Sequence, residues 1–191
     1  MTVIGLYSLV PGSGKTTLAE CLRGHGYRRL SFAAPLREML ATLMRWQGCP
    51  EREIKDALRG EGKEVPNAYL CGATPRHAMQ TLGTDWGRQM IHRHIWVDAA
   101  GQGARYVRRR GKKVVFDDVR FLNEAELIRV NLGGIVIRID RAGFAPPAWK
   151  HESEGQLADF VPDLVINNDA DTAAGFVLKA SEAIAAMGQR R

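Results

Sequence analysis

Short apolar segments alternate with longer amphipathic segments along this chain of 191 residues. Five of the apolar segments have the composition of strands that are covered on both faces of a sheet. They lie at residues 3–7, 29–32, 113–116, 135–139 and 164–166. Because helical segments separate them, the pattern predicts an α/β fold with a parallel sheet of about five strands and helices on both faces.

Two long helices follow from a hydrophobic period of 3.6 residues. The first begins at Pro35, since proline suits a first helical turn, and continues to residue 46. The second begins at Thr74-Pro75. Its predicted apolar stripe consists of Ala78, Met79, Leu82, Trp86 and Met90.

The remaining segments are shorter or irregular. Short helices are expected at 18–22 and 51–59, a capping-box pattern at 123–126 begins another, and a closing helix covers 172–187. Residues 47–72 are otherwise polar and loop-rich, and 142–154 form an excursion between the last two strands. The length suits a single domain over 1–191.

Composition is that of a soluble globular protein, with 45% hydrophobic and 25% charged residues. No apolar run approaches the roughly 20 residues of a membrane helix, and no signal-peptide pattern precedes the first strand. The three cysteines are odd in number and lack metal-ligand spacing. These features together predict reduced thiols and a cytoplasmic protein without a membrane partner.

Much of the formal net charge of +6 lies in the basic run at 105–113. Such runs occur in nucleic-acid-binding patches and also at the solvated end of a helix before a buried strand. The second interpretation is favoured, because positive charge complements the C-terminal end of the helix dipole. No stable nucleic-acid partner is expected.

The segment after the first strand has the residues of a phosphate-binding loop (P-loop). Residues 8–17 read Ser-Leu-Val-Pro-Gly-Ser-Gly-Lys-Thr-Thr and lie between a strand and a helix. Glycines let successive N–H groups face phosphate oxygens, and the helix N-terminus adds positive potential. Lys15 would reach the terminal phosphates and Thr16 would help to hold Mg²⁺. Leu9 replaces the first glycine of the usual pattern, so the geometry of the loop's entry stays open.

Three candidate residues follow the third strand, at the edge of an open parallel sheet where ligands bind. Asp118 is the preferred carboxylate to face Mg²⁺, directly or through water, or the attacking group, and Asp117 is second. A pair of aspartates that only caps the next turn is the alternative. Arg120 is well placed to bridge phosphates with bidentate hydrogen bonds.

Arg76 lies in the first turn of the second long helix, where its charge opposes the helix dipole. A bound anion would explain this position, and an exposed arginine without a ligand explains it equally well. Arg141, Lys150 and His151 lie in or beside the excursion at 142–154. A cationic lid that excludes water and a plain surface loop are both compatible with this composition.

The segment 83–88 interrupts a helical pattern with Gly83 and Gly87. Glycines within a helix suggest close approach by another backbone or by a ligand. Trp86 either stacks on a base or fills the core, and core packing is favoured because it lies on the apolar stripe. Asp85 and Arg88 either pair with each other or contact a nucleotide.

Together these motifs resemble those of the bacteriophage-type deoxynucleoside monophosphate kinases, from residue 3 to about residue 171. Their order and spacing carry the resemblance. They lie at 8–17, 32–37, 74–76 with 83–88, 95–97, 118–121 with 123–126, 133–136, 151–154 and 163–168.

The resemblance implies a P-loop kinase fold that transfers the γ-phosphate of ATP to a deoxynucleoside 5′-monophosphate. It implies an acceptor-binding helical region at about 35–100 and a mobile lid at about 141–154. Ala34 stands where the family has an acidic residue, a change that would affect an acceptor-side contact and base preference. The oligomeric state stays open, with a homodimer as one option.

The candidate site combines the residue patterns with the resemblance. Catalysis is assigned to Lys15, Asp118 and Arg120, with Thr16 and Asp118 nearest Mg²⁺. ATP and Mg²⁺ are assigned to Gly12, Ser13, Gly14, Lys15, Thr16, Thr17, Arg141 and Asn168. The acceptor is assigned to Arg76, Asp85, Trp86, Arg88 and Arg120.

Three other functions fit parts of the sequence. A P-loop kinase for another small acceptor, such as dephospho-coenzyme A, would share the donor site. An NTPase module acting on nucleic acid would use the P-loop and the basic run, but no glutamate adjoins Asp117-Asp118 to activate water. A nucleotide-binding protein without catalysis is the third.

Overall fold

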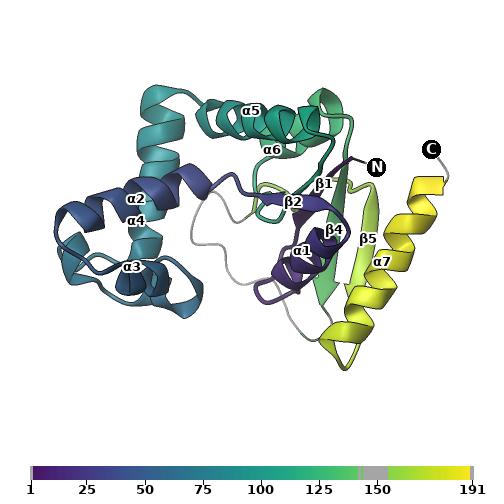
Figure 1. Cartoon of the computed structure of the whole chain (residues 1–191), viewed down its shortest axis with the longest axis horizontal. Coiled ribbons are helices and arrows are strands. Elements are labelled where there is room, and N and C mark those ends of the chain that lie inside the picture. The colour runs from purple at the N-terminus through teal and green to yellow at the C-terminus, as the bar shows by residue number, and fades with distance from the viewer. Residues whose placement is uncertain (1, 142, 144–154, 190–191) are drawn as a thin grey trace. The chain divides into compact units, whose positions relative to one another are not determined.

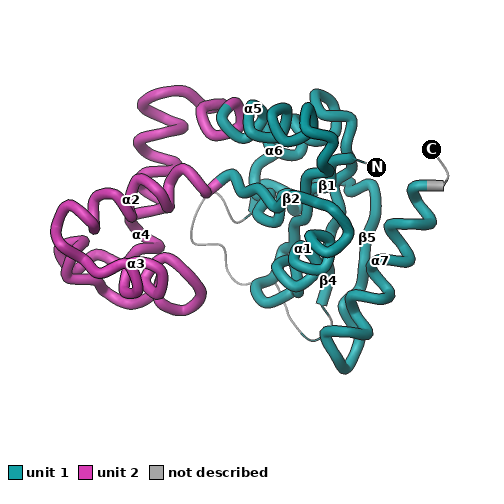
Figure 2. Tube along the Cα trace, viewed as in Figure 1, with its two compact units in different colours: residues 1–32, 99–191 teal, residues 33–98 magenta. Residues whose placement is uncertain are grey.

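The computed structural model describes residues 2–141, 143 and 155–189. The chain forms two compact units (Figure 2). Unit 1 contains residues 1–32 and 99–191, and unit 2 contains residues 33–98. Unit 2 nearly coincides with the helical region expected at 35–100.

Unit 1 is built on a parallel sheet of five strands (Figure 1). The strands are β1 (Val3–Tyr7), β2 (Tyr27–Leu30), β3 (Lys113–Phe116), β4 (Ile135–Arg141) and β5 (Leu164–Asn168). Their order is β2-β3-β1-β4-β5, which places β1 at the centre with Ile4 opposite Val115 and Ile135. The predicted α/β class and parallel sheet are confirmed.

Helices α1 (Lys15–Gly24) and α7 (Ala173–Gln189) cover one face of this sheet. Ile4 and Leu6 of β1 point to this face and pack with Leu18 of α1 and Phe176 of α7. Each of these four side chains is at most 1% exposed. Among the described residues, this face forms one hydrophobic core of unit 1.

The other face is covered by α5 (Ile95–Arg109), α6 (Leu122–Glu126) and the π-helical turn η4 (Leu127–Asn131) (Figure 1). A Cβ atom on Gly5 of β1 would lie 2.5 Å from Ile128 Cδ1, so η4 approaches the strand closely only because residue 5 is glycine. Gly101 of α5 similarly faces Leu127. Helices therefore cover both faces, as predicted.

Unit 2 contains α2 (Ala34–Trp46), α3 (Glu51–Ala57), α4 (Pro75–Thr81) and the π-helical η3 (Leu82–Ile91). Two short 3₁₀ turns, η1 (Gly60–Glu64) and η2 (Ala68–Leu70), lie between α3 and α4. The core of the unit is formed by α2 and α3 around Met44 and Ile54, which are 0% and 2% exposed. Met79 and Leu82 pack against this core.

The predicted apolar stripe on the second long helix is correct only as far as Leu82. The helix changes there from α to π, and i→i+5 hydrogen bonding adds a residue to each turn, which rotates later side chains off the stripe. Gly83, Thr84 and Gly87 are buried instead. Trp86 and Met90 are 36% and 75% exposed, so the favoured core position of Trp86 is wrong.

Three element boundaries also differ from the prediction. The edge strand β2 occupies Tyr27–Leu30 rather than 29–32, because Ser31 and Phe32 leave the sheet to bind Asp118. Helix α6 begins at Leu122, one residue before the predicted capping box. Helix α5 ends within the basic run and is followed by buried β3, as the favoured interpretation of that run required.

Residues 142 and 144–154 lie outside the described part of the chain, and with them most of the predicted lid, including Lys150 and His151. Among the described residues, no helix combines the length and apolar character that crossing a membrane requires.

Candidate functional site

The P-loop connects the carboxyl end of β1 to the N-terminus of α1. Gly12 and Gly14 have φ angles of +67° and +101°, in the left-handed region that side-chain-bearing residues avoid. Gly14 is the N-cap residue of α1. The loop therefore directs backbone N–H groups and the positive end of the helix dipole toward one point, as an anion site requires.

The entry of the loop does not need glycine at position 9. Among the described non-glycine residues only Cys71 has a positive φ, so Leu9 has an ordinary backbone conformation. Ser8 closes the entry turn, because its hydroxyl accepts from Val10 N at 3.2 Å and lies 3.1 Å from Val10 O. The departure from the usual pattern at Leu9 is therefore compatible with the loop.

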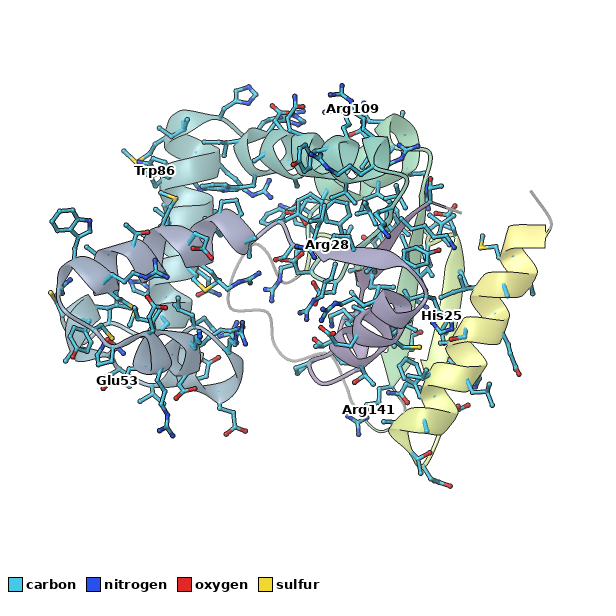
Figure 3. All side chains as sticks on the ribbon, viewed as in Figure 1. His25, Arg28, Glu53, Trp86, Arg109 and Arg141 are labelled. Atoms are coloured by element: carbon cyan, nitrogen blue, oxygen red, sulfur yellow. The ribbon has the colours of Figure 1, made fainter. Side chains whose placement is uncertain are left out.

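Residues at the carboxyl ends of β4 and β5 support the P-loop. Asn168 Nδ2, at the end of β5, donates to Ser13 O at 2.9 Å. Arg141 Nη1, at the end of β4, donates to Gly12 O at 2.6 Å (Figure 3). A Cβ on Gly14 would lie 2.9 Å from both Asn168 and Phe176. Both predicted ATP-side residues thus contact the loop itself.

Lys15 is the first residue of α1, and its Nζ lies 3.2 Å from Ser13 Oγ. Burial of the ammonium group and the nearby positive charge of Arg120 lower the pKa of Lys15 to about 8. The charges of Asp117 and Asp118 oppose this shift. Lys15, Asp117, Asp118 and Arg120 are therefore close enough to interact electrostatically, as the sequence predicted for the carboxyl edge.

Asp118 holds the segment that follows β2. Its Oδ2 accepts from Ser31 Oγ at 2.5 Å and its Oδ1 accepts from Phe32 N at 3.0 Å. Each carboxylate oxygen keeps acceptor capacity beyond one hydrogen bond. Asp118 therefore has a structural role, but it binds the segment after β2 rather than capping the next turn, as the alternative expected.

Asp117 is the more buried of the two carboxylates, with its side chain 6% exposed. Arg29 Nη2 forms an ion pair with Asp117 Oδ2 at 2.5 Å, and Arg29 Nη1 reaches Glu20 of α1 at 2.7 Å. Burial nevertheless raises the pKa of the Asp117 carboxyl. This ion-pair chain links α1, β2 and the end of β3 beside the P-loop.

Arg120 is exposed, and its backbone is fixed by a buried acid. Glu124 Oε2 accepts from Arg120 N at 2.8 Å and from Phe121 N at 3.2 Å. Glu124 is 2% exposed, so the turn that carries Arg120 is held from the protein side. Arg120 is exposed, and its positive charge is close enough to Lys15 to lower the pKa of that lysine.

The other predicted acceptor residues belong to unit 2. Thr74 caps α4 by accepting from His77 N at 3.2 Å, and Arg76 forms an ion pair with Glu64 of η1. Arg88 Nη1 donates to Arg93 O at 3.1 Å. Arg76 and Arg88 lie on one continuous helix, at most roughly 18 Å apart along its axis at about 1.5 Å per residue. The two arginines are therefore well separated along the helix.

The glycines of η3 make room for side chains rather than for a backbone or a ligand. A Cβ on Gly87 would lie 2.4 Å from Trp96 Cζ2, and one on Gly83 would lie 3.0 Å from Leu36 Cδ1. Trp96 Nε1 donates to Gly83 O at 2.8 Å. Trp86 lies beside Trp96, with ring centroids 6.1 Å apart, and is 36% exposed.

Sequence reasoning missed the residues that position the site: Ser31, Arg29 and Glu124. Arg29 in a predicted buried strand was a usable signal, because a buried guanidinium needs an anionic partner. Glu124 follows Phe121 at capping-box spacing. Nothing local marks Ser31 as the partner of a carboxylate 87 positions away.

Comparisons with known proteins agree with one another. A family model described as deoxynucleotide monophosphate kinase matches residues 69–175. A putative deoxynucleotide monophosphate kinase of Acanthamoeba polyphaga mimivirus is 34% identical over 180 residues, covering 88% of this chain and 89% of the relative. The deoxynucleoside-5′-monophosphate kinase of Escherichia phage T5 is 38% identical over 72 residues, covering 38% of this chain and 28% of the relative.

Solved structures are more distant. Dephospho-CoA kinase from Campylobacter jejuni aligns over 96% of this chain and 95% of its own, with 13% sequence identity and a TM-score of 0.47. A protein from Thermus thermophilus aligns over 97% and 96%, with 17% identity and a TM-score of 0.46.

Proposed function

The chain belongs to the deoxynucleotide monophosphate kinase family, and from this membership we propose that it transfers the γ-phosphate of ATP to a deoxynucleoside 5′-monophosphate. The products are ADP and the deoxynucleoside diphosphate. The observation that carries the proposal is the P-loop geometry at the carboxyl end of β1, with Lys15, Arg120 and two aspartates around it. Two anions and a positively charged, preorganised site are what this transfer requires.

The donor half of the site would hold ATP with Mg²⁺. The left-handed Gly12 and Gly14 support binding of the β- and γ-phosphates by backbone N–H groups, with Ser13, Lys15 and Thr17 beside them. Thr16 lies exposed in the first turn of α1, where its hydroxyl is free to ligate the ion. Asp118 would complete the metal shell through water, since Ser31 and Phe32 already bind its two oxygens.

Arg141 and Asn168 would act on ATP through the loop. Each donates to a P-loop carbonyl, and this would hold the neighbouring N–H groups toward the phosphates. Asn168 would also contact the adenine of ATP directly, and Arg141 would also contact a phosphate. Both residues would then hold the P-loop in its conformation and also contact ATP.

Acceptor binding would use the residues that the sequence assigns to it: Arg76, Asp85, Trp86, Arg88 and Arg120. Arg120 would bridge the acceptor phosphate and the transferred phosphoryl group, because it lies close enough to act electrostatically on Lys15. The exposed ring of Trp86 supports stacking on the base. Arg76 would exchange Glu64 for an acceptor oxygen.

In the proposed reaction, an acceptor phosphate oxygen attacks the γ-phosphorus in line with the departing ADP oxygen. One P–O bond forms as the other breaks, and the protein supplies orientation and charge. Lys15 and Arg120 neutralise the negative charge on the oxygens around the transferred group. Asp118 orients the acceptor side by fixing the segment after β2.

The first experiment measures ADP formation from MgATP with each deoxynucleoside monophosphate in turn, using Lys15→Ala as the control. Acceptor-dependent ADP together with a diphosphate product, both lost in the variant, is the expected result. Phosphorylation of dephospho-coenzyme A alone would assign another acceptor. ADP release that ignores every acceptor and rises with DNA would replace the kinase by an NTPase.

A further inference from the structure

The basic run at 105–113 has no part in the proposed kinase reaction. Segment 99–116 contains six Lys and Arg residues out of the 27 in the chain and none of the 21 Asp and Glu residues. The rest of the chain is therefore formally neutral, and this one segment supplies the whole net charge of +6. We call its six cations the basic surface. They are Arg105, Arg108, Arg109, Arg110, Lys112 and Lys113.

All six residues of the basic surface are exposed. Their contacts are with neutral groups: Arg108 Nη1 donates to Leu132 O at 3.1 Å, and the Arg110 guanidinium lies 3.6 Å from the Tyr106 ring centroid. Lys113 Nζ lies 5.2 Å from the Tyr27 ring centroid. Within the described residues, none of the six forms an ion pair with a carboxylate. No carboxylate of the described residues therefore pairs with these charges.

The basic surface lies at the edge of the sheet opposite to the P-loop. Strand β3 begins at Lys113 and ends at Phe116, just before Asp117. Four residues of strand span roughly 13 Å at about 3.3 Å each. Because the strands are parallel, all their carboxyl ends lie on the P-loop side. A phosphate bound at Lys15 is therefore not what the basic surface contacts.

Strand β2 extends this surface by one more charge. Arg28 is exposed and pairs in register with Val114, next to Lys113. Leu30 points to the same side of β2 as Arg28 and lies 3.9 Å from the Cβ position of Gly103 in α5. Arg28 therefore lies on the α5 side of the strand. Figure 3 labels Arg28 and Arg109 on these two elements.

The composition of the surface favours a phosphodiester backbone over other polyanions. Four of its six cations are arginines, whose planar guanidinium groups bind phosphate oxygens in pairs. A membrane-binding helix would add exposed apolar side chains for insertion. Tyr106 is the one exposed large hydrophobic residue between 99 and 116, and the Arg110 guanidinium lies over its ring.

We propose that the basic surface binds the phosphate backbone of nucleic acid, without reading base sequence, at a place separate from the nucleotide site. Such contacts release counterions, so binding is weak at physiological salt and strengthens steeply as salt falls. The partner is transient rather than stable. The inference does not rest on the proposed kinase function, and either can fail without the other.

The test measures fluorescence anisotropy of a fluorescein-labelled 20-nucleotide oligothymidylate with the full chain across a series of NaCl concentrations. The variant Arg105→Gln/Arg109→Gln/Lys112→Gln removes three charges and leaves the packed Arg108, Arg110 and Lys113 in place. Its log–log salt slope should be shallower by roughly 2, since each lost phosphate contact contributes about 0.7 on single strands. Affinity at 0.1 M NaCl should fall about 100-fold.

The matched control is Arg52→Gln/Lys55→Gln/Arg59→Gln, which removes the same net charge from exposed positions of unit 2. It should bind the oligonucleotide nearly as well as the wild type. If both variants lose the same affinity for the oligonucleotide, net charge alone explains the loss, and the proposal is overturned. The proposal is also overturned if the wild type does not bind the oligonucleotide at low salt, or if saturating MgADP displaces the oligonucleotide. Binding to anionic vesicles but not to the oligonucleotide would overturn it as well.

A second measurement uses only the wild-type chain, so it holds even if the triple variant does not fold. An oligothymidylate carrying 4-thiothymidine is photo-crosslinked to the protein and the crosslinked peptides are mapped. Crosslinks within 99–116 or at Arg28 support the proposal. Crosslinks confined to 8–17 or to unit 2 contradict it.

Discussion

At the scale of single residues, Lys15 shows how an anion site is prepared before its ligand binds. Burial and the charge of Arg120 hold its pKa at about 8. Polyphosphate favours the charged ammonium and raises this pKa again. ATP binding should therefore take up protons above pH 8 and none through this lysine near pH 7, where it is already charged.

Isothermal titration in buffers of different ionisation enthalpy measures that uptake. At pH 8.5 a group with a pKa of about 8 is roughly three-quarters neutral, so MgATP should bind with uptake of roughly 0.7 proton. Lys15→Arg is the matched control, because arginine keeps the charge but does not titrate. Equal uptake by wild type and Lys15→Arg would assign the proton to another group.

Arg120 permits a cleaner test of catalysis than Asp118. Asp118→Ala would also release Ser31 and the backbone of Phe32, so activity and folding would change together. The Arg120 side chain is exposed, and its backbone contact to Glu124 survives truncation. Arg120→Ala should lower kcat by about 10³-fold or more, since one charge clamp is worth this much in phosphoryl transfer.

The control for Arg120 is Arg52→Ala, an arginine on α3 whose side chain is 94% exposed. It should keep wild-type kcat, and both variants should keep the wild-type melting temperature. A folded Arg120→Ala enzyme with normal kcat would remove Arg120 from the catalytic group.

At the scale of elements, the π-helix η3 is fitted to Trp96. Adding a Cβ at Gly87 places it 2.4–2.6 Å from the indole ring, so Trp96 must move and its bond to Gly83 O is strained. Gly87→Ala should lower the unfolding free energy by about 1–3 kcal/mol, the usual cost of overpacking a core. Urea denaturation followed by tryptophan fluorescence measures the change.

Gly103 of α5, unlike Gly87, has room for a Cβ atom. A Cβ there would meet only Leu30 Cδ1, at an ordinary contact distance of 3.9 Å. Gly103→Ala should therefore raise the unfolding free energy by about 0.5–1 kcal/mol through helix propensity alone. If both substitutions shift stability in the same direction, close packing by Trp96 is not what requires glycine at 87.

At the scale of the whole molecule, the two units have cores of unequal size. Unit 1 buries both faces of a five-stranded sheet, whereas the core of unit 2 joins short helices around Met44 and Ile54. Less buried apolar surface means a lower free energy of local opening. Backbone amides of α2 and α3 should exchange with deuterium faster than those of β1 and β3.

Hydrogen exchange measured by mass spectrometry tests this order. MgADP should then protect segment 8–20, because it binds the P-loop of unit 1. Equal protection of α2 and β1 without ligand would mean that the units open as a single cooperative body.

The sequence by itself determined the strands, the P-loop and the family. Strands and the P-loop depend on neighbouring residues: a buried strand is an apolar run, and the P-loop is glycines, lysine and threonine at fixed spacing between a strand and a helix. The family follows from the order of such motifs along the chain. Such signals act over a few positions, so β1, β3 and the start of α4 were predicted correctly. The glycines at 83 and 87 were noticed for the same reason.

The tertiary structure alone decided which distant residues meet. Asp118 binds Ser31, 87 positions earlier, and Asn168 binds Ser13, 155 positions earlier, because the strand order brings their loops to one edge. It also decided that η3 turns Trp86 and Met90 outward and that the basic surface lies opposite to the P-loop. Pairing across a sheet is set by packing of the whole chain, which local spacing does not encode.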